Sequence, residues 1–268
     1  VYISDLSAWY NVSFGDNSAN PLCYAKNLYL NGELVTELVI PDGVTKIGDY
    51  SFSGCSGLAS ITIPASVANI GNSAFYGCSN LKKVLNFSNL KFSKGSSEYG
   101  QVARYADEVI NLPNGCIDGD FAWCKINGVN TLARYFGDAS ELTLPADYKG
   151  ESYVIGEGAF KDCSTIKSVA IPNGVTSIEK EAFCDCTGLT NVTIGNSVTE
   201  IYQYAFRYCT GLKSVTLGAN VASIGYGAFE HCMDHTVINY SKLTLIKGQR
   251  HNGGVAQYAE EIINKQSE

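Results

Sequence analysis

The sequence predicts a solenoid, a fold in which short repeats stack in one direction and share a continuous core. Two kinds of marker residue keep a common period of 23 residues within each half of the chain. The phenylalanines of this pattern are Phe52, Phe75, Phe160, Phe183, Phe206 and Phe229. The cysteines, each three residues after a phenylalanine, are Cys55, Cys78, Cys163, Cys186, Cys209 and Cys232. A unit of this length cannot bury its apolar face alone, so in-phase markers indicate that each repeat packs on its neighbours.

Each repeat begins with alternating apolar residues, as in Leu58-x-x-Ile61-x-Ile63. A period of two predicts a short strand that lines a parallel sheet. Further copies cover residues 34–40, 166–171, 189–194 and 212–217. A proline or glycine follows each copy, and these residues extend a strand poorly.

The rest of the repeat closes the coil. A Val-x-x-Ile-Gly segment, as at residues 67–71, is expected to pack inward from the opposite wall. The following Ala-Phe-x-x-Cys segment predicts an irregular or short helical turn, because it is too brief for a stable amphipathic helix. The spacing of the phenylalanines predicts a buried, stacked column of rings.

The in-phase cysteines predict a ladder of buried free thiols. Parallel neighbours in register hold their side chains in the same direction, which suits stacking and suits the disulfide torsion poorly. Four cysteines lie outside this ladder and either pair or stay free: Cys23, Cys116, Cys124 and Cys184.

Two segments interrupt the period. Asn127-Gly128 separates two apolar stretches, and this dipeptide favours the positive φ angles of a type I′ turn, so a β-hairpin is predicted over residues 121–136. Asn31-Gly32 predicts a similar hairpin over residues 28–34.

A long duplication has an offset of 153 residues: residues 86–90 recur at 239–243, and residues 102–111 recur at 255–264. Apolar spacing in the second pair predicts a short helix packed on the solenoid, with Asp107, Glu108, Glu260 and Glu261 on its solvated face. The predicted organisation is one continuous solenoid, with an irregular or hairpin cap at 1–33, a repeat block at 34–85, an irregular unit with a short helix and a hairpin at 86–141, a second block at 142–238 and the duplicated unit at 239–268.

Composition excludes several partners. The net charge is −7 and no cluster of Lys or Arg interrupts it, which argues against nucleic acid and anionic membrane as partners. No apolar run approaches the roughly 20 residues of a membrane span. The chain starts at Val1 without a charged and apolar leader, which is expected of a mature protein whose secretion signal has been removed.

The sequence offers no set of catalytic residues at usable spacing. It lacks a Gly-x-Ser-x-Gly motif, a phosphate loop and a paired His-Glu motif. The donor atoms of residues 231–235 could hold a metal only if Cys232 left the thiol ladder. We therefore expect no metal, no cofactor and no enzymatic activity.

Strand positions that point away from the core are the natural place for a ligand. They carry small uncharged side chains at Ser60, Thr62, Ser168, Asn191, Thr193, Ser214 and Thr216. The alternative is a plain solvated sheet face, since such residues are seldom binding hot spots. Trp123 and Tyr135 in the irregular unit are better anchors in principle, or else they cap the core.

Residues 58–78 resemble the repeat of the BspA-like leucine-rich-repeat family, bacterial surface proteins of the gut Bacteroidetes type. That repeat runs Leu-x-x-Ile-x-Ile-Pro-x-Ser-Val-x-x-Ile-Gly-x-x-Ala-Phe-x-x-Cys, and Ser66-Val67, Ile70-Gly71 and Ala74-Phe75 match it. Gly195 and Gly218 depart from it, since they replace the proline.

The resemblance implies a leucine-rich-repeat solenoid with about 23 residues per repeat, on an exported protein at the cell surface or outside the cell. It also implies a non-enzymatic protein-binding or adhesion module whose partner is a host or bacterial surface macromolecule. A structural spacer of a larger surface protein and a glycan-binding module are the alternatives.

Overall fold

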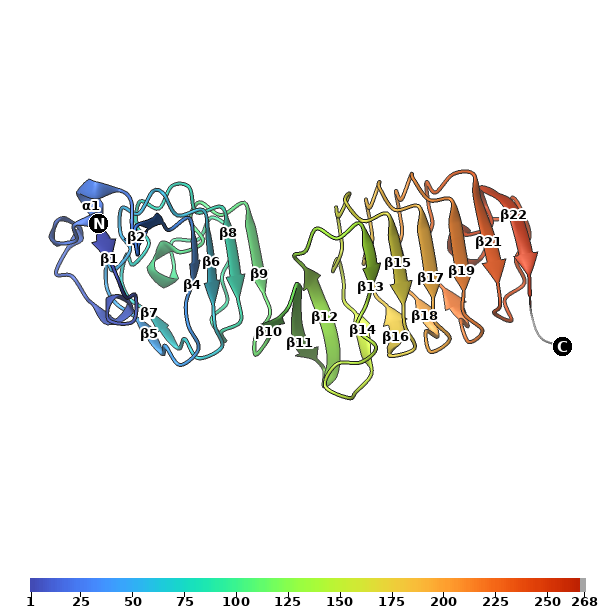
Figure 1. The fold of residues 1–268 in the computed structure, drawn as a ribbon, viewed down its shortest axis with the longest axis horizontal. Coiled ribbons are helices and arrows are strands. Elements are labelled where there is room, and N and C mark those ends of the chain that lie inside the picture. The colour runs from blue at the N-terminus through green and yellow to red at the C-terminus, as the bar shows by residue number, and fades with distance from the viewer. Residues whose placement is uncertain (266–268) are drawn as a thin grey trace. The chain divides into compact units, whose positions relative to one another are not determined.

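The computed structural model describes residues 1–265 as coils of short strands that stack along two walls (Figure 1). The chain divides into two compact units, one over Val1–Cys116 and one from Ile117 onward. Each unit has its own hydrophobic core. Both units are solenoids of the predicted kind, while their union into one continuous solenoid stays a prediction.

The first unit opens with an irregular cap. The cap contains a three-stranded sheet and three short helices: β1 (Tyr2–Ile3), β2 (Tyr29–Leu30), β3 (Glu33–Leu34), η1 (Trp9–Asn11), η2 (Asn17–Ala19) and α1 (Leu22–Ala25). The predicted hairpin is confirmed, because β2 and β3 pair antiparallel across Asn31 and Gly32, which have φ values of 52° and 90°.

Stacked coils follow the cap. Their main wall is a parallel sheet in the order β4 (Glu37–Val39), β6 (Ser60–Ile63), β8 (Lys83–Asn86) and β9 (Glu108–Asn111). The opposite wall pairs β5 (Lys46–Ile47) with β7 (Asn69–Ile70), so the Val-x-x-Ile segments expected to pack inward also form strands. A 3-10 turn, η3 (Tyr99–Gln101), precedes β9.

The second unit repeats this plan with more coils. Its main sheet has the order β13 (Glu141–Thr143), β15 (Ser168–Ile171), β17 (Asn191–Ile194), β19 (Ser214–Leu217), β21 (His235–Asn239) and β22 (Ala259–Asn264). Its second wall has the order β10 (Cys116–Asp118), β11 (Phe121–Ile126), β12 (Val129–Tyr135), β14 (Tyr153–Ile155), β16 (Val175–Ile178), β18 (Glu200–Ile201) and β20 (Ser223–Ile224). The hairpin predicted at Asn127-Gly128 is confirmed by the antiparallel β11 and β12. The turn η4 (Asn252–Gly254) precedes β22.

The phenylalanine column is confirmed. All six rings are fully buried. Neighbouring rings stack nearly parallel, with centroids 4.6 Å apart for Phe160 and Phe183 and 5.3 Å apart for Phe52 and Phe75. Each column starts on a buried tyrosine ring, since Tyr10 lies 6.0 Å from Phe52 and Tyr135 lies 5.2 Å from Phe160.

Hydrogen bonds between coils explain why the Ala-Phe turn is not a helix. The amide of Phe160 donates to the carbonyl of Ala182 in the next coil at 2.7 Å, and Phe183 does the same to Ala205. These amides therefore link successive coils and are not used for i to i−4 bonds within a turn.

The thiol ladder is confirmed for five of its six members. Cys55, Cys78, Cys186, Cys209 and Cys232 are buried free thiols, and Cys23 and Cys184 outside the ladder are also free. The thiols of Cys78 and Cys186 each donate to the carbonyl of a phenylalanine one coil earlier, Phe52 at 3.2 Å and Phe160 at 3.0 Å. Cys163 is only partly buried, because it begins the ladder of the second unit and has no column cysteine before it.

The prediction of helices at residues 102–111 and 255–264 is wrong. The second half of each segment is a strand, β9 or β22, that pairs in parallel with β8 or β21. The β-branched pair Val109 and Ile110 suits a strand, and docking on the preceding coil overrides the local apolar spacing. The four carboxylates expected on a helix lie in or beside these strands instead.

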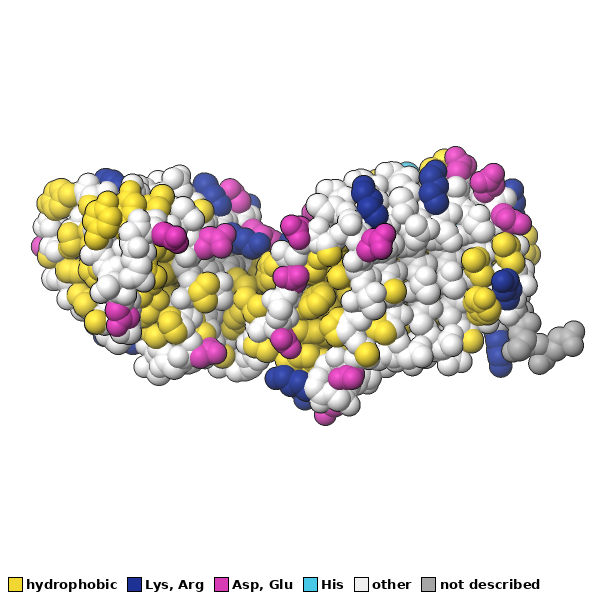
Figure 2. Space-filling model, in the orientation of Figure 1, with side chains coloured by type: hydrophobic (Ala, Val, Ile, Leu, Met, Phe, Trp, Pro, Cys, Tyr) yellow, Lys and Arg dark blue, Asp and Glu magenta, His cyan; other side chains and the backbone are white. Residues whose placement is uncertain are grey.

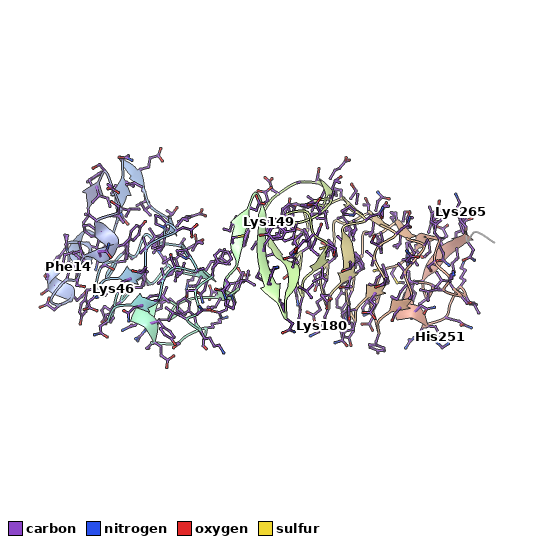
Figure 3. The ribbon with its side chains drawn as sticks, turned by 90° about the horizontal axis from the view of Figure 1, so that it is seen from below. Phe14, Lys46, Lys149, Lys180, His251 and Lys265 are labelled. Atoms are coloured by element: carbon purple, nitrogen blue, oxygen red, sulfur yellow. The ribbon has the colours of Figure 1, made fainter. Side chains whose placement is uncertain are left out.

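The duplication corresponds to the last coil of each unit, which we call the terminal coil, residues 86–111 and 239–264. His251 and Lys265, at the C-terminal end of the second unit, flank the segment from η4 to β22 (Figure 3). In the first unit, Asn86 donates to the side chain of Asn111 at 2.8 Å and accepts from the amide and hydroxyl of Ser88. Asn239 makes the same bonds with Asn264 and Ser241, so the copied sequence encodes a copied buried network.

Candidate binding surface

The outward face of the main sheet in the second unit carries two straight rows of side chains. Parallel pairing in register produces the rows Glu141, Ser168, Asn191, Ser214, Thr236 and Thr143, Ala170, Thr193, Thr216, Ile238. Apolar neighbours such as Val192 and Val215 point inward and are buried. Figure 2 shows the middle of this face, over β15 to β19, as mostly neither charged nor hydrophobic.

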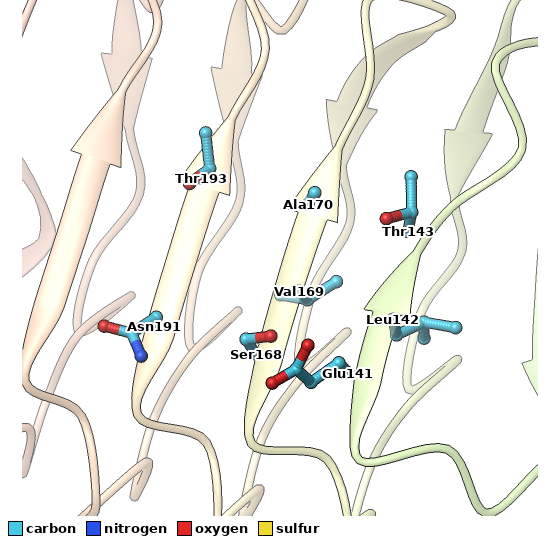
Figure 4. Close-up of a pocket in the computed structure, with 8 residues that line it drawn as sticks. All are labelled: Glu141, Leu142, Thr143, Ser168, Val169, Ala170, Asn191 and Thr193. Atoms are coloured by element: carbon cyan, nitrogen blue, oxygen red, sulfur yellow. The ribbon is translucent and has the colours of Figure 1, made fainter.

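A shallow hollow of about 320 Å³ lies on this face near β13. Ser168 and Ala170 of β15 form its centre, with Asn191 and Thr193 of β17 on one side and Glu141 of β13 on the other (Figure 4). Hydroxyl and amide groups can donate or accept hydrogen bonds here, while Glu141 offers one negative charge. The structure thus brings together Ser168, Asn191 and Thr193, and Ser214 and Thr216 continue the same rows.

Ser60 and Thr62 belong to a different environment. They lie on β6 in the first unit, where the row through Ser60 also holds Glu37, Lys83 and Glu108. Lys83 and Glu108 form an ion pair at 3.8 Å. The row through Thr62 holds the apolar Val39, Leu85 and Ile110. This face of the first unit is therefore charged along one row and apolar along the other, and Ser60 and Thr62 do not share the small uncharged surface of the second unit.

Trp123 and Tyr135 are core residues. Only 2% of Trp123 and 4% of Tyr135 is exposed. Trp123 stacks on Tyr148 with ring centroids 4.1 Å apart, and the Tyr135 hydroxyl accepts the amide of Ala139 at 3.0 Å. Burial raises the pKa of Tyr135. The prediction that Trp123 and Tyr135 anchor a ligand is therefore corrected, because a ligand on the surface does not reach their rings.

A cluster that the sequence interpretation missed lies on the turns of the second unit. This aromatic ridge comprises Tyr204, Arg207, Tyr208, Tyr226 and His231. The Arg207 guanidinium lies 4.8 Å from the ring of Tyr204 and 4.7 Å from that of Tyr208. Tyr208 stacks on His231 with ring centroids 4.5 Å apart, and the rings of Tyr204 and Tyr226 meet nearly at right angles with centroids 5.8 Å apart.

A signal for the ridge exists in the repeat itself. The position two residues after each column phenylalanine of the second unit holds Asp162, Asp185, Tyr208 and His231 in successive coils. Aromatic residues replace acidic ones only in the last two coils that carry a column phenylalanine, and such a change at a surface position points to a specialised patch.

Burial limits the reactivity of two ladder thiols and encloses one histidine in the described part of the chain. Burial raises the pKa of Cys55 and of Cys163 to about 11, so both stay protonated at neutral pH. The side chain of His235 is fully buried, and its Nε2 lies 2.8 Å from the carbonyl oxygen of Val255. Within residues 1–265 no group of three or more His, Cys, Asp or Glu side chains is arranged to hold a metal ion. None of the helices in this part has the length and apolar character needed to cross a membrane.

Comparison with known proteins identifies the repeat. The model of the BspA type leucine rich repeat region matches in six copies, over residues 25–101 and 136–251. A leucine-rich repeat protein from Bacteroides capillosus ATCC 29799 is 24% identical with a TM-score of 0.40, over 56% of this chain and 98% of its own. A leucine rich cell surface protein from Faecalibacterium prausnitzii A2-165 is 20% identical with a TM-score of 0.40, over 88% of this chain and 61% of its own, so this chain spans less than two thirds of that protein's length. No curated protein matches the chain.

Proposed function

Because the chain belongs to the BspA-type leucine-rich-repeat family, we propose that it is a non-enzymatic module that binds a surface protein of a host or bacterium. The proposed binding surface is the sheet face of the second unit, centred on Ser168, Asn191, Thr193, Ser214 and Thr216. The module acts outside the cytoplasm, at the cell surface or in the extracellular medium.

One observation carries this proposal: rows of small uncharged side chains continue in register from β15 to β19. A stacked sheet offers a continuous surface without long flexible side chains to order, which lowers the entropy cost of binding. Thr193 is exposed and Thr216 partly exposed, so both are open to a partner.

Affinity per module is expected to be low. Binding hot spots favour Trp, Tyr and Arg, and the rows offer Ser, Thr and Asn. Several linked copies could raise the overall avidity by about 10²–10⁴ where geometry allows simultaneous contact. The chain should therefore be presented on a multivalent support.

The test is a screen of bead-displayed protein against arrays of host and bacterial surface proteins and of glycans. We expect hits on the protein array that Thr193→Arg and Thr216→Arg each weaken at least tenfold. Ala222→Arg is the matched control, since Ala222 is exposed outside the main sheet and receives the same charge. Absence of any hit would favour a structural spacer, and hits that both variants retain would place binding on another face.

A further inference from the structure

A second hollow lies at the C-terminal end of the second unit, away from the sheet face. It has a volume of about 170 Å³, and its walls include Tyr226, Glu230, His231, Arg250, Gln257 and Tyr258. Drug-sized ligands occupy roughly 300–1,000 Å³, so this hollow is sized for a single small ring. It mixes aromatic surface with hydrogen-bonding groups, which is typical of a ligand site.

One wall of the hollow is held in place by the aromatic ridge. Tyr226 is 72% exposed, yet its ring packs nearly at right angles against that of Tyr204. His231 stacks face to face on Tyr208, with an angle of 1° between the rings. Exposed rings that are fixed by neighbours lose little conformational entropy when a ligand binds.

Two glycines allow the turn before β22 to approach this wall closely. Gly253 has a φ of 63°, and a Cβ there would meet the carbonyl oxygen of Gly225 at 2.5 Å. Gly254 has a φ of 76° and lies on the hollow with no side chain to fill it.

The charges around the hollow leave a net positive site. Glu230 is neutralised, because its Oε2 lies 2.7 Å from Nε of Arg207. Arg250 is exposed, and it has no ion pair with any other residue of the range 1–265. A guanidinium in this position is suited to a carboxylate, which it can bind through two parallel hydrogen bonds.

We propose that this hollow binds one carboxylated sugar ring of a glycan. The carboxylate would pair with Arg250, the apolar face of the ring would lie against Tyr226 or Tyr258, and hydroxyls would bond to Gln257 and Glu230. Uronic acids and sialic acids share this chemistry. The site is independent of the sheet face proposed to bind protein.

The terminal coil of the first unit supports this assignment by contrast. With the offset of 153 residues, Tyr105 corresponds to Tyr258, but Gln101 corresponds to Gly254. Arg104 donates to Oε1 of Gln101 at 3.0 Å and lies over the ring of Tyr105 at 5.7 Å. The first unit therefore carries a glutamine side chain, bonded to Arg104, at the position where Gly254 has no side chain.

This contrast supplies a blocking variant, Gly254→Gln. Gln101 adopts a φ of 68° in the first unit, close to the 76° of Gly254, so glutamine is compatible with this backbone. A Cβ on Gly254 would meet nothing closer than Oε1 of Gln257 at 3.3 Å, the end of a flexible side chain. The variant should fold and close the hollow.

The experiment titrates the full chain with glucuronate-terminated and sialylated oligosaccharides, and with the neutral parent oligosaccharides, by isothermal calorimetry or ligand-observed NMR. We expect at least one carboxylated class to bind about tenfold or more tightly than its neutral parent, as a charge-assisted pair allows. Arg250→Gln and Gly254→Gln should each abolish this preference, and Thr216→Arg on the sheet face should leave it unchanged. Comparison of the glucuronate-terminated with the sialylated oligosaccharides shows whether the hollow prefers a uronic acid or a sialic acid.

Three outcomes would overturn the proposal. They are no binding of either acidic sugar, equal binding of acidic and neutral sugars, and binding that survives both Arg250→Gln and Gly254→Gln. Thermal unfolding of each variant within a few degrees of the parent chain excludes loss of fold as the cause.

Discussion

The two terminal coils share an interior and differ on the surface. Asn86 and Asn239 form the same buried hydrogen bonds, and each side-chain amide also donates to a backbone carbonyl four residues later, that of Leu90 or Leu243. On the surface, Gln101 is replaced by Gly254. Stacking constrains the interior of a solenoid because every coil must fit its neighbour, whereas the outer turns can change without disturbing that fit. The two copies can therefore differ at this outer turn, with glutamine in the first and glycine beside the hollow in the second.

The largest expected effect breaks the shared interior. Phe183 stacks between Phe160 and Phe206, at centroid distances of 4.6 Å and 5.0 Å, and Phe183→Ala should lower the free energy of unfolding by about 3–5 kcal/mol through the cavity it leaves. Phe75→Ala should cost somewhat less, because Phe75 stacks on Phe52 and next meets a terminal coil without a column phenylalanine.

Urea unfolding followed by fluorescence measures both changes, and hydrogen exchange assigns each to its unit. A loss below about 1 kcal/mol for Phe183→Ala would contradict the stacked column, since core truncations of aromatic residues cost several times more.

The next effect tests whether the copied networks are equivalent. Asn86→Ala and Asn239→Ala each remove the oxygen that accepts the amide and hydroxyl of the buried Ser88 or Ser241, and an unsatisfied buried group costs roughly 1–3 kcal/mol. We expect each variant to destabilise its own unit by about 2–3 kcal/mol. Site-resolved hydrogen exchange on the full chain provides the measurement. Costs that differ by more than about 1 kcal/mol would show that the two networks only look alike, since non-equivalent contexts change such values.

Much of the fold follows from the sequence, because its periodicity has a simple physical cause. Phe183 and Cys186 recur at a fixed interval since each must meet its counterpart one coil away. The same logic located the strand Ser168–Ile171, whereas the hairpin at Asn127-Gly128 followed from the turn preference of that dipeptide. It failed for residues 102–111, where helix-like apolar spacing competed with pairing to β8, a contact that local pattern does not reveal.

The candidate surfaces were less predictable. Alternation along a strand shows that Thr193 and Thr216 face outward, since side chains of a strand point to alternate faces. Pattern alone did not show that Trp123 and Tyr135 are buried, because both lie in an irregular unit with no repeat to fix their direction. The aromatic ridge combines residues from different coils, and its contacts depend on rotamers that a sequence does not specify.

A buried histidine leads us to expect that the two units respond differently to pH. Leucine or isoleucine begins the strand segment in most coils, as at Leu81 and Leu212, but the buried His235 stands at this position in the second unit. Burial lowers the pKa of His235 below the ordinary value of 6.5, although the nearby charge of Asp234 and backbone hydrogen bonds oppose this. The unfolded chain therefore takes up a proton that the folded state resists.

The second unit should consequently lose stability as the pH falls from about 6.5 toward the lowered pKa of the folded state. Above that window His235 is neutral in both the folded and the unfolded state, so its burial no longer lowers the free energy of unfolding as the pH changes. Thermal unfolding at pH 8.0 and at pH 5.0 measures the loss, and hydrogen exchange should assign it to the second unit. His235→Leu restores the residue of the other coils and should remove most of the pH dependence. An equal loss in the variant would show that other groups are responsible.

The smallest effect concerns thiol access and leaves stability unchanged. Cys163 begins the ladder of the second unit and is partly exposed, whereas Cys186, one coil further, is buried and bonded to the carbonyl of Phe160. Cys55 begins the ladder of the first unit but is buried, because the cap with Cys23 packs on the adjacent turn at Gly54.

In the native chain, a thiol reagent should therefore modify the exposed Cys116 first, and Cys163 more slowly since its pKa is raised to about 11. Cys186 and Cys55 should react only after unfolding. Mass spectrometry of peptides after timed alkylation gives the order, and all ten cysteines should react in denatured, unreduced protein. Modification of Cys55 as fast as Cys163 would show that the cap does not cover the first coil, and an unreactive pair in denatured protein would reveal a disulfide in place of the free thiols.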